Sequence, residues 1–172
     1  MVKKSFLYSL RPVFICIALV AVILGCLSLF GCIPNINDMY AKKFADQLIQ
    51  TPAPDDCLVL EHHMALGKLV GNGNNMDFAA VVLLQTGFEI TIEDVIEHYS
   101  AFDFVPAKGK NRFGQRTVML DVEQVEQAYF DNEIFVRREL RFENIINSEE
   151  YRYYAVIIYD GGYEAGFDLQ GN

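Results

Sequence analysis

An uncharged, strongly apolar stretch near the N-terminus constrains this chain more than any other feature. It runs from Pro12 to Asn37, and its apolar core, Val13–Ile33, is 21 residues long. A helix of that length measures about 31 Å at 1.5 Å per residue, close to the ~30 Å hydrocarbon core of a bilayer. Only a helix satisfies its own backbone polar groups there. The sequence therefore predicts a membrane segment over residues 1–33.

Charge around this stretch predicts its orientation. Lys3, Lys4 and Arg11 precede it with no acidic residue, whereas the flank that follows is close to neutral. The positive-inside rule then places the N-terminus in the cytoplasm and the rest of the chain outside. We therefore expect a linker at 34–37 and an extracytoplasmic domain over 38–172.

A lipobox-like motif offers a second interpretation of the same segment. Residues 29–32 read Leu-Phe-Gly-Cys, which resembles the site where bacterial lipoprotein signals are cut, and Cys32 is the residue that would receive lipid. Phe30 departs from the usual residue at its position, and the apolar run exceeds the 7–15 residues of an ordinary signal. Cys26 is a second candidate. Two alternatives stay open: a helix retained in the bacterial cytoplasmic membrane, or a lipid anchor on its outer surface.

The remainder of the chain is acidic. The whole chain has 14 basic and 23 acidic residues, a net charge of −9, and residues 1–31 contribute +3, so residues 32–172 carry −12. Nucleic-acid binding needs Lys and Arg to displace counterions, so we expect no nucleic-acid partner. Cys57 is the one cysteine in 34–172, which excludes a disulfide within the domain, and it is interpreted as a small buried hydrophobe.

Apolar residues at helical spacing predict two helices. They recur every three or four positions from Tyr40 to Ile49, after Asn37, whose side chain can cap the helix. A second helix is predicted over 92–99, with Thr91 as its cap.

Alternating polarity predicts a β-hairpin. Residues 57–66 alternate as in a half-buried strand, with Cys57 and His63 on one face. In the next segment both faces carry apolar residues, which is typical of a central strand: Met76, Phe78, Ala80, Val82 and Leu84 on one face, and Ala79, Val81 and Leu83 on the other. The glycine- and asparagine-rich residues 71–75 between them predict the turn.

The C-terminal third of the chain is predicted to add strands. Residues 117–129 fit either a strand or a helix. Residues 134–142, with Val136 facing inward, and residues 151–159 are predicted as strands, the latter followed by a tight turn at 160–162. The expected fold is α+β, with one antiparallel sheet and two or three helices packed mainly on one face.

The hairpin carries a resemblance to a group of known proteins. From Gly67 to Met76 the sequence follows the pattern G-K-x-x-G-N-G-N-x-M. This pattern is similar to a hairpin of small uncharacterised membrane-anchored bacterial proteins, in which a helix like that at 92–99 follows. The resemblance covers about residues 57–102. It implies an envelope protein of Gram-positive type and no particular activity.

Catalytic motifs are not apparent. The glycine-rich turn lacks the third glycine of a dinucleotide fingerprint and the Ser or Thr of a phosphate-binding loop. His62 and His63 point to opposite strand faces and cannot chelate one metal ion, and His62 is interpreted as bonded to backbone. Cys57 lies about 20 Å from His63 along the predicted strand. We therefore assign no catalytic, cofactor-binding or metal-binding residue.

These features predict a non-catalytic binding or accessory module, held at the membrane, for an envelope protein or wall component. The alternative is a small envelope hydrolase that uses His or carboxylate residues. The basic loop from Lys108 to Arg116 has two interpretations. It is either a contact with an anionic membrane, worth about 1 kcal/mol per residue, or a solvated loop that balances an acidic domain.

Overall fold

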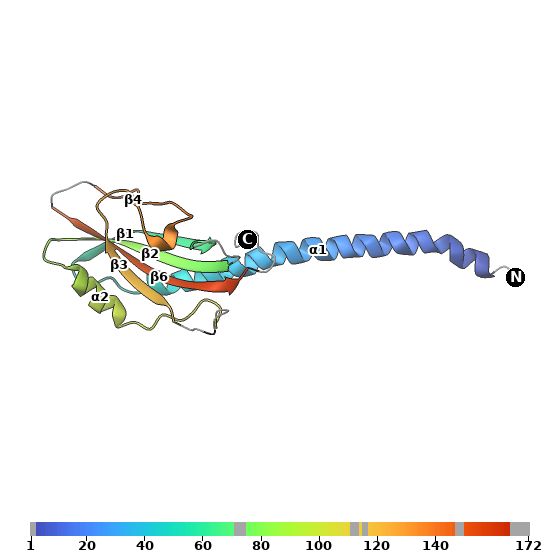
Figure 1. Cartoon of the computed structure of the whole chain (residues 1–172), viewed down its shortest axis with the longest axis horizontal. Coiled ribbons are helices and arrows are strands. Elements are labelled where there is room, and N and C mark those ends of the chain that lie inside the picture. Colours follow the sequence, from blue (N-terminus) through green and yellow to red (C-terminus); the bar gives the residue numbers. More distant parts are fainter. Residues whose placement is uncertain (1–2, 71–74, 111–113, 115–116, 147–149, 166–172) are drawn as a thin grey trace.

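The computed structural model describes residues 3–70, 75–110, 114, 117–146 and 150–165, with the side chains of 3–11 and 27–34 left out (Figure 1). The class is α+β, as the sequence predicts. The elements in chain order are α1 (Lys3–Ile49), β1 (Cys57–Gly67), β2 (Asn75–Thr86), α2 (Ile92–Ser100), β3 (Met119–Gln124), β4 (Tyr129–Phe130), the 3-10 helix η1 (Glu133–Phe135), β5 (Leu140–Arg141) and β6 (Arg152–Glu164).

Four antiparallel strands form the main sheet in the order β1-β2-β6-β3. The predicted hairpin and the central position of its second strand are confirmed, since β2 pairs with β1 on one side and β6 on the other. The ambiguous residues 117–129 supply β3 as an edge strand paired with β6. The first edge of the sheet is β1, and this edge carries the candidate site described below.

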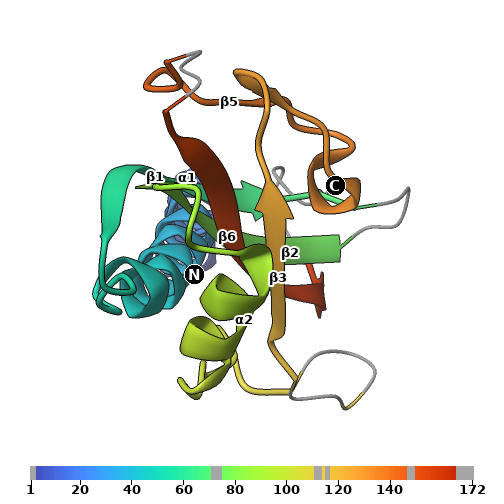
Figure 2. The ribbon, with the colours of Figure 1, turned by 90° about the vertical axis from the view of Figure 1, so that its left-hand side faces the viewer.

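Each face of the sheet is covered by different elements (Figure 2). On one face, α1 and α2 share a buried cluster with side chains of all four strands. The other face is covered by the segment with β4, η1 and β5, which contributes Phe130, Ile134, Phe135 and Phe142 to a second cluster. Both faces of β2 and β6 are therefore removed from water, which explains their continuous apolar sequence.

Helix α1 passes without a break through residues 34–37, where the sequence predicts a linker and a helix start. Asn37 is buried, and its Oδ1 accepts a hydrogen bond from Lys108 Nζ, so its side chain is engaged in tertiary structure rather than in capping. The preceding part of α1 extends away from the sheet (Figure 1), and the side chains of residues 12–26 are exposed. Within the described residues, no helical segment combines the length and apolarity needed to cross a membrane.

The helix α2 begins as predicted. The Thr91 hydroxyl accepts a hydrogen bond from the backbone N–H of Asp94, and the Asp94 carboxylate accepts one from the Thr91 N–H at 2.8 Å. This reciprocal pair satisfies two backbone donors that a helix start otherwise leaves open. The cap fixes where α2 starts against the sheet.

Only Leu140–Arg141, as β5, is a strand within the predicted range 134–142, and the first part of the range is wrong. Asn132 Oδ1 accepts from the Ile134 N–H at 2.7 Å and starts η1, so the chain turns instead of extending. Val136, expected to face inward, is 72% exposed.

The turn predicted at 160–162 is also wrong, because β6 continues to Glu164. Met76 pairs with Tyr163 and Phe78 with Asp160, so the register shifts at Gly161 and Gly162 between them. Gly162 takes a φ of +81°. The Gly162 N–H donates to the Asp77 carboxylate at 2.9 Å. This bond keeps the irregular part of the strand on the sheet.

Docking of α1 on the sheet is testable through Phe44, which is 1% exposed in the cluster that α1 shares with β2. We expect Phe44→Ala to lower the free energy of unfolding by about 3–5 kcal/mol, because it leaves a cavity between helix and sheet. Ile49→Ala, at a 36% exposed position of the same helix, should cost about 0.5 kcal/mol. Urea unfolding of the full chain in mild detergent, followed by tyrosine circular dichroism, measures both. Equal losses would contradict the docking.

Candidate functional site

A β-bulge decides which side chains of β1 face the candidate site. Val59 lies opposite Leu84, but Glu61 lies opposite Leu83, so Leu60 is the extra residue. The bulge moves Cys57 to the helix-covered face and leaves His63 on the other face. The prediction that Cys57 and His63 share a face is therefore wrong, because strict alternation fails at Leu60.

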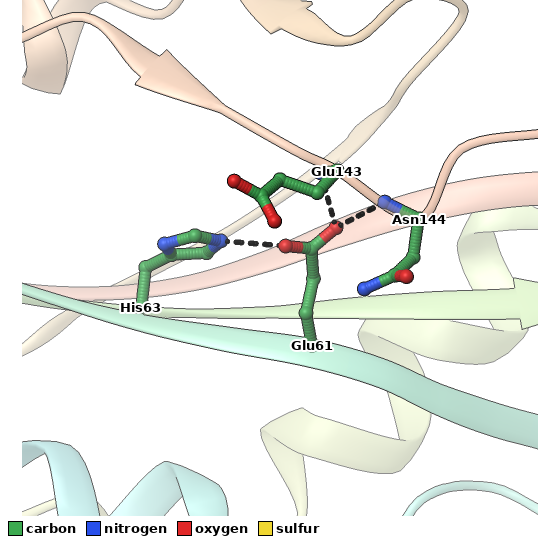
Figure 3. Close-up of polar contacts among 4 residues, drawn as sticks. All are labelled: Glu61, His63, Glu143 and Asn144. Atoms are coloured by element: carbon green, nitrogen blue, oxygen red, sulfur yellow. Dashed lines mark hydrogen bonds and ion pairs between the residues drawn. The ribbon is translucent and has the colours of Figure 1, made fainter.

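Glu61 and His63 form the polar centre of this part of the sheet (Figure 3). His63 Nε2 lies 3.0 Å from Glu61 Oε2, and their side chains are 31% and 12% exposed. Because a carboxylate only accepts, the ring carries its proton on Nε2. Glu61 Oε1 accepts from the backbone N–H groups of Glu143 and Asn144 at 2.9 and 3.0 Å. Both oxygens of Glu61 are thus engaged.

These contacts also fix the loop that follows β5. The His63 ring packs edge-on against Phe142, with ring centroids 5.5 Å apart. The Glu143 side chain extends from the loop in the direction of His63 (Figure 3). Glu61 therefore acts as a clamp between the edge strand and the loop, and it orients His63 at the same time.

A pocket of about 320 Å³ opens beside His63, between β1 and the segment that contains β5. We call it the His63 pocket. Its charged lining consists of Arg138, Arg141 and Glu139, and its floor is apolar. The full lining is His63, Met64, Ala65, Val81, Phe135, Arg138, Glu139, Leu140 and Arg141.

A second pocket of about 470 Å³ adjoins the first, and the two share Met64 and Arg138. We call it the basic pocket, because Lys68, Arg137 and Arg138 outnumber Asp38 in its lining, which Leu66 and Leu69 complete. The two pockets together form the β1 groove. Its lining has four basic and two acidic side chains, a clear reversal of the overall charge of the domain: Lys68, Arg137, Arg138, Arg141, Asp38 and Glu139.

The other two histidines do not join this groove. His98 Nε2 lies 2.8 Å from the Pro52 carbonyl oxygen, and its ring packs against Tyr99 and Phe102. His62 is exposed and has no hydrogen bond to any described residue, so its interpretation as a backbone-bonded residue is wrong. The backbone-bonded histidine is His98, which ties α2 to the chain after α1.

The cysteines give no reactive centre in the part of the chain that the structure describes. Burial, and then the charge of Asp56, raise the pKa of the Cys57 thiol, which disfavours the nucleophilic thiolate. The backbone of Cys32 lies within α1, and its side chain is outside the described residues. In the same described part, no three His, Cys, Asp or Glu side chains are grouped to hold a metal ion.

A pair of buried aspartates forms a second polar cluster, at the end of the sheet from which α1 leaves. Asp77 accepts from the N–H groups of Leu69, Val70 and Gly162. Asp160 Oδ2 accepts from the Ala107 N–H and the Tyr163 hydroxyl, both at 2.6 Å. Because these acceptors are used by backbone and tyrosine groups, the cluster is structural.

No family model, curated protein or solved structure matches the chain. The site therefore rests on its geometry.

Sequence reasoning missed the basic residues of the groove. The signal available was Arg138, which interrupts the apolar positions of 134–142. Lys108, expected in a loop at a membrane or in solvent, instead packs over the rings of Tyr40 and Phe78. The other arginines of this predicted loop, Arg112 and Arg116, lie outside the described residues.

The buried Asp160 predicts a pH dependence. Burial raises the pKa of its carboxyl above the ordinary 3.8, outweighing the hydrogen bonds from Tyr163 and Ala107. Folding thus favours its protonated form. The protonated Asp160 carboxyl stabilises the folded state fully at pH values below its pKa in the unfolded chain. This stabilisation is lost as the pH rises through its pKa in the folded chain.

We therefore expect Asp160→Asn to gain stability relative to the wild type as pH rises from about 3 to 7. Asp94→Asn is the matched control with the opposite sign, because hydrogen bonds from Thr91 lower the pKa of Asp94. Urea unfolding at several pH values measures both differences. Parallel curves for Asp160→Asn and the wild type would refute the raised pKa.

Proposed function

We propose that this chain is a membrane-anchored cell-envelope protein whose extracytoplasmic domain, residues 38–172, is a non-catalytic binding module. Its ligand is an anionic group of an envelope protein or wall component, bound in the His63 pocket. The observation that carries this proposal is the charge of that pocket. The lining contains two arginines, Arg138 and Arg141, and one glutamate, Glu139, so it is net positive. Residues 32–172 as a whole carry a net charge of −12. Arginine suits such a ligand because its planar fork binds carboxylate or phosphate through paired hydrogen bonds.

The anchor is proposed from the apolar residues 13–33 and the three basic residues before them. Support for a short, stiff connection comes from α1, whose helical backbone continues to the residues buried on the sheet, Ala41–Leu48. Both forms of the anchor, a retained helix or a lipid on Cys32, keep this connection. The domain then stands close to the outer surface of the bacterial cytoplasmic membrane.

The bonding of Glu61 supports a binding role over catalysis. One of its oxygens holds His63 and the other holds two backbone amides, so the carboxylate has a structural task. Among the described residues, His63 Nδ1 has no hydrogen-bond partner and no nucleophile is paired with the ring. A Glu–His pair beside a pocket is nevertheless the arrangement that a hydrolase would use to activate water, with Nδ1 as the base. A hydrolase is therefore the second candidate.

Intact mass of the protein from a membrane fraction tests the anchor. We expect it to remain in the membrane after an alkaline wash, which removes peripherally bound proteins. A full-length mass would identify a retained helix, and a mass without residues 1–31 plus lipid would identify Cys32 as the anchor. Release of a full-length chain by the wash would contradict both forms.

Cross-linking in native membranes tests the binding module against the hydrolase. We expect the same partner on the wild type and on His63→Ala, and its loss, by at least about tenfold, on Arg141→Glu, because reversed charge repels an anionic ligand. A hydrolase would instead accumulate uncleaved substrate on His63→Ala. Recovery of the wild-type protein without any partner would refute the proposal.

A further inference from the structure

Three positively charged side chains line the basic pocket, and they come from two distant parts of the chain. Lys68 follows the end of β1, whereas Arg137 and Arg138 follow η1. Asp38 on α1 is the acidic member of the lining, so the pocket carries a net +2. This charge contrasts with the −12 of residues 32–172 and points to a function.

Asp38 offsets part of the positive charge of this pocket. No carboxylate among the described residues forms an ion pair with Lys68, Arg137 or Arg138. Arg138 Nη1 donates to the Leu66 carbonyl oxygen at 3.3 Å, and that acceptor is neutral. Cations gathered in a pocket repel one another and create a positive potential that an anion relieves. The chemistry of the pocket is therefore that of an anion site.

The pocket lies at the end of the domain from which α1 leaves, because Asp38 of α1 is part of its wall. Figure 1 shows that the ends of β1 and β6 lie at this end, and α2, with its acidic residues, lies toward the other. Asp38 is five residues beyond Ile33, about 7.5 Å along a helix. The headgroup region of one leaflet is about 5–7 Å thick. The proposed anchor would thus hold the pocket at the level of lipid headgroups.

Exposed apolar side chains occur in the lining of the basic pocket and next in sequence to its residues, and Met64 of the lining is 43% exposed. Val136 directly precedes Arg137 and is 72% exposed, and Met39 directly follows Asp38 and is 52% exposed. Ile36, on the same part of α1, is also exposed. Basic residues mixed with exposed apolar ones are typical of surfaces that lie in a membrane interface. This pattern favours a lipid over a free anion as the occupant.

We infer that the basic pocket binds the phosphate of an anionic phospholipid headgroup in the leaflet at which α1 anchors the domain. Arg137 and Arg138 bind the phosphate oxygens, and Lys68 adds a third positive charge. The bound lipid fixes the rotation of the domain about α1, so that the His63 pocket keeps a constant direction relative to the membrane. The inference rests on the proposed anchor.

Titration of the full chain in detergent micelles with phosphatidylglycerol, read by native mass spectrometry, tests this inference. We expect phosphatidylglycerol to bind in preference to phosphatidylcholine. Arg137→Glu with Arg138→Glu should weaken that binding by at least about tenfold. Arg137→Gln with Arg138→Gln removes charge without reversing it and should give a smaller loss. Circular dichroism verifies that each variant is folded.

The matched control is Lys42→Glu with Lys43→Glu, because both lysines are exposed on α1 near Asp38 and lie outside the pocket. This control makes the same change in net charge and should keep phosphatidylglycerol binding. Equal loss in the two double variants would show general electrostatic attraction and overturn the inference. Full competition by millimolar inorganic phosphate would identify a free-anion site and also overturn it.

Flotation of the full chain with pure phosphatidylcholine vesicles separates this inference from the proposed anchor. Flotation without any preference for phosphatidylglycerol would refute the lipid site and leave the anchor standing. Failure to float with the neutral vesicles would refute the anchor itself.

Discussion

The buried carboxylate of Asp77 is the interaction on which the end of the domain that holds the basic pocket depends. A carboxylate that is 1% exposed is tolerated only when its oxygens are hydrogen-bonded. Asp77 meets this requirement with the N–H groups of Leu69, Val70 and Gly162, which lie just after β1 and near the end of β6. One side chain at the start of β2 thus ties together the ends of its two neighbouring strands. Lys68 precedes Leu69, whose N–H donates to Asp77, so these hydrogen bonds hold the backbone on one side of the basic pocket.

A second set of contacts joins α1 to the same end of the sheet. Lys108 donates to Asn37 and lies over the rings of Tyr40 and Phe78, and Asp160 holds the backbone of the same loop through Ala107. Asn37 and Tyr40 are therefore packed on the domain, and α1 stays helical through residues 35–38, although this sequence suits a linker. Tertiary contacts outweigh the local signals of Pro and Asn there. The direction in which α1 leaves the domain is fixed by these contacts.

Local patterns account for the parts of the fold that the sequence predicts. The capping pair Thr91 and Asp94, the alternation along β1 and the apolar run of β2 each depend on neighbours in the sequence. The parts that differ depend on distant partners. The bulge at Leu60 reverses the face of Cys57, the extension of β6 requires Asp77, and η1 requires the Asn132 cap in place of a strand. The groove belongs to the second kind, because Lys68 and Arg137 meet only in the folded chain.

The cations of the basic pocket lie apart from the acidic start of α2, and the buried Asp77 and Asp160 lie at the same end as the pocket. The capped start of α2 places Glu93 and Asp94 where acidic side chains favour the helix dipole. Figure 1 shows α2 toward the end of the domain away from the point where α1 leaves it. Arg137 and Lys68, which form no ion pair with any described residue, lie at the other end. With the proposed anchor in place, an anionic membrane surface would attract these cations. The β1 groove, which runs from the basic pocket to His63, would then open from the headgroup layer outward, and a partner bound beside His63 would lie above the membrane.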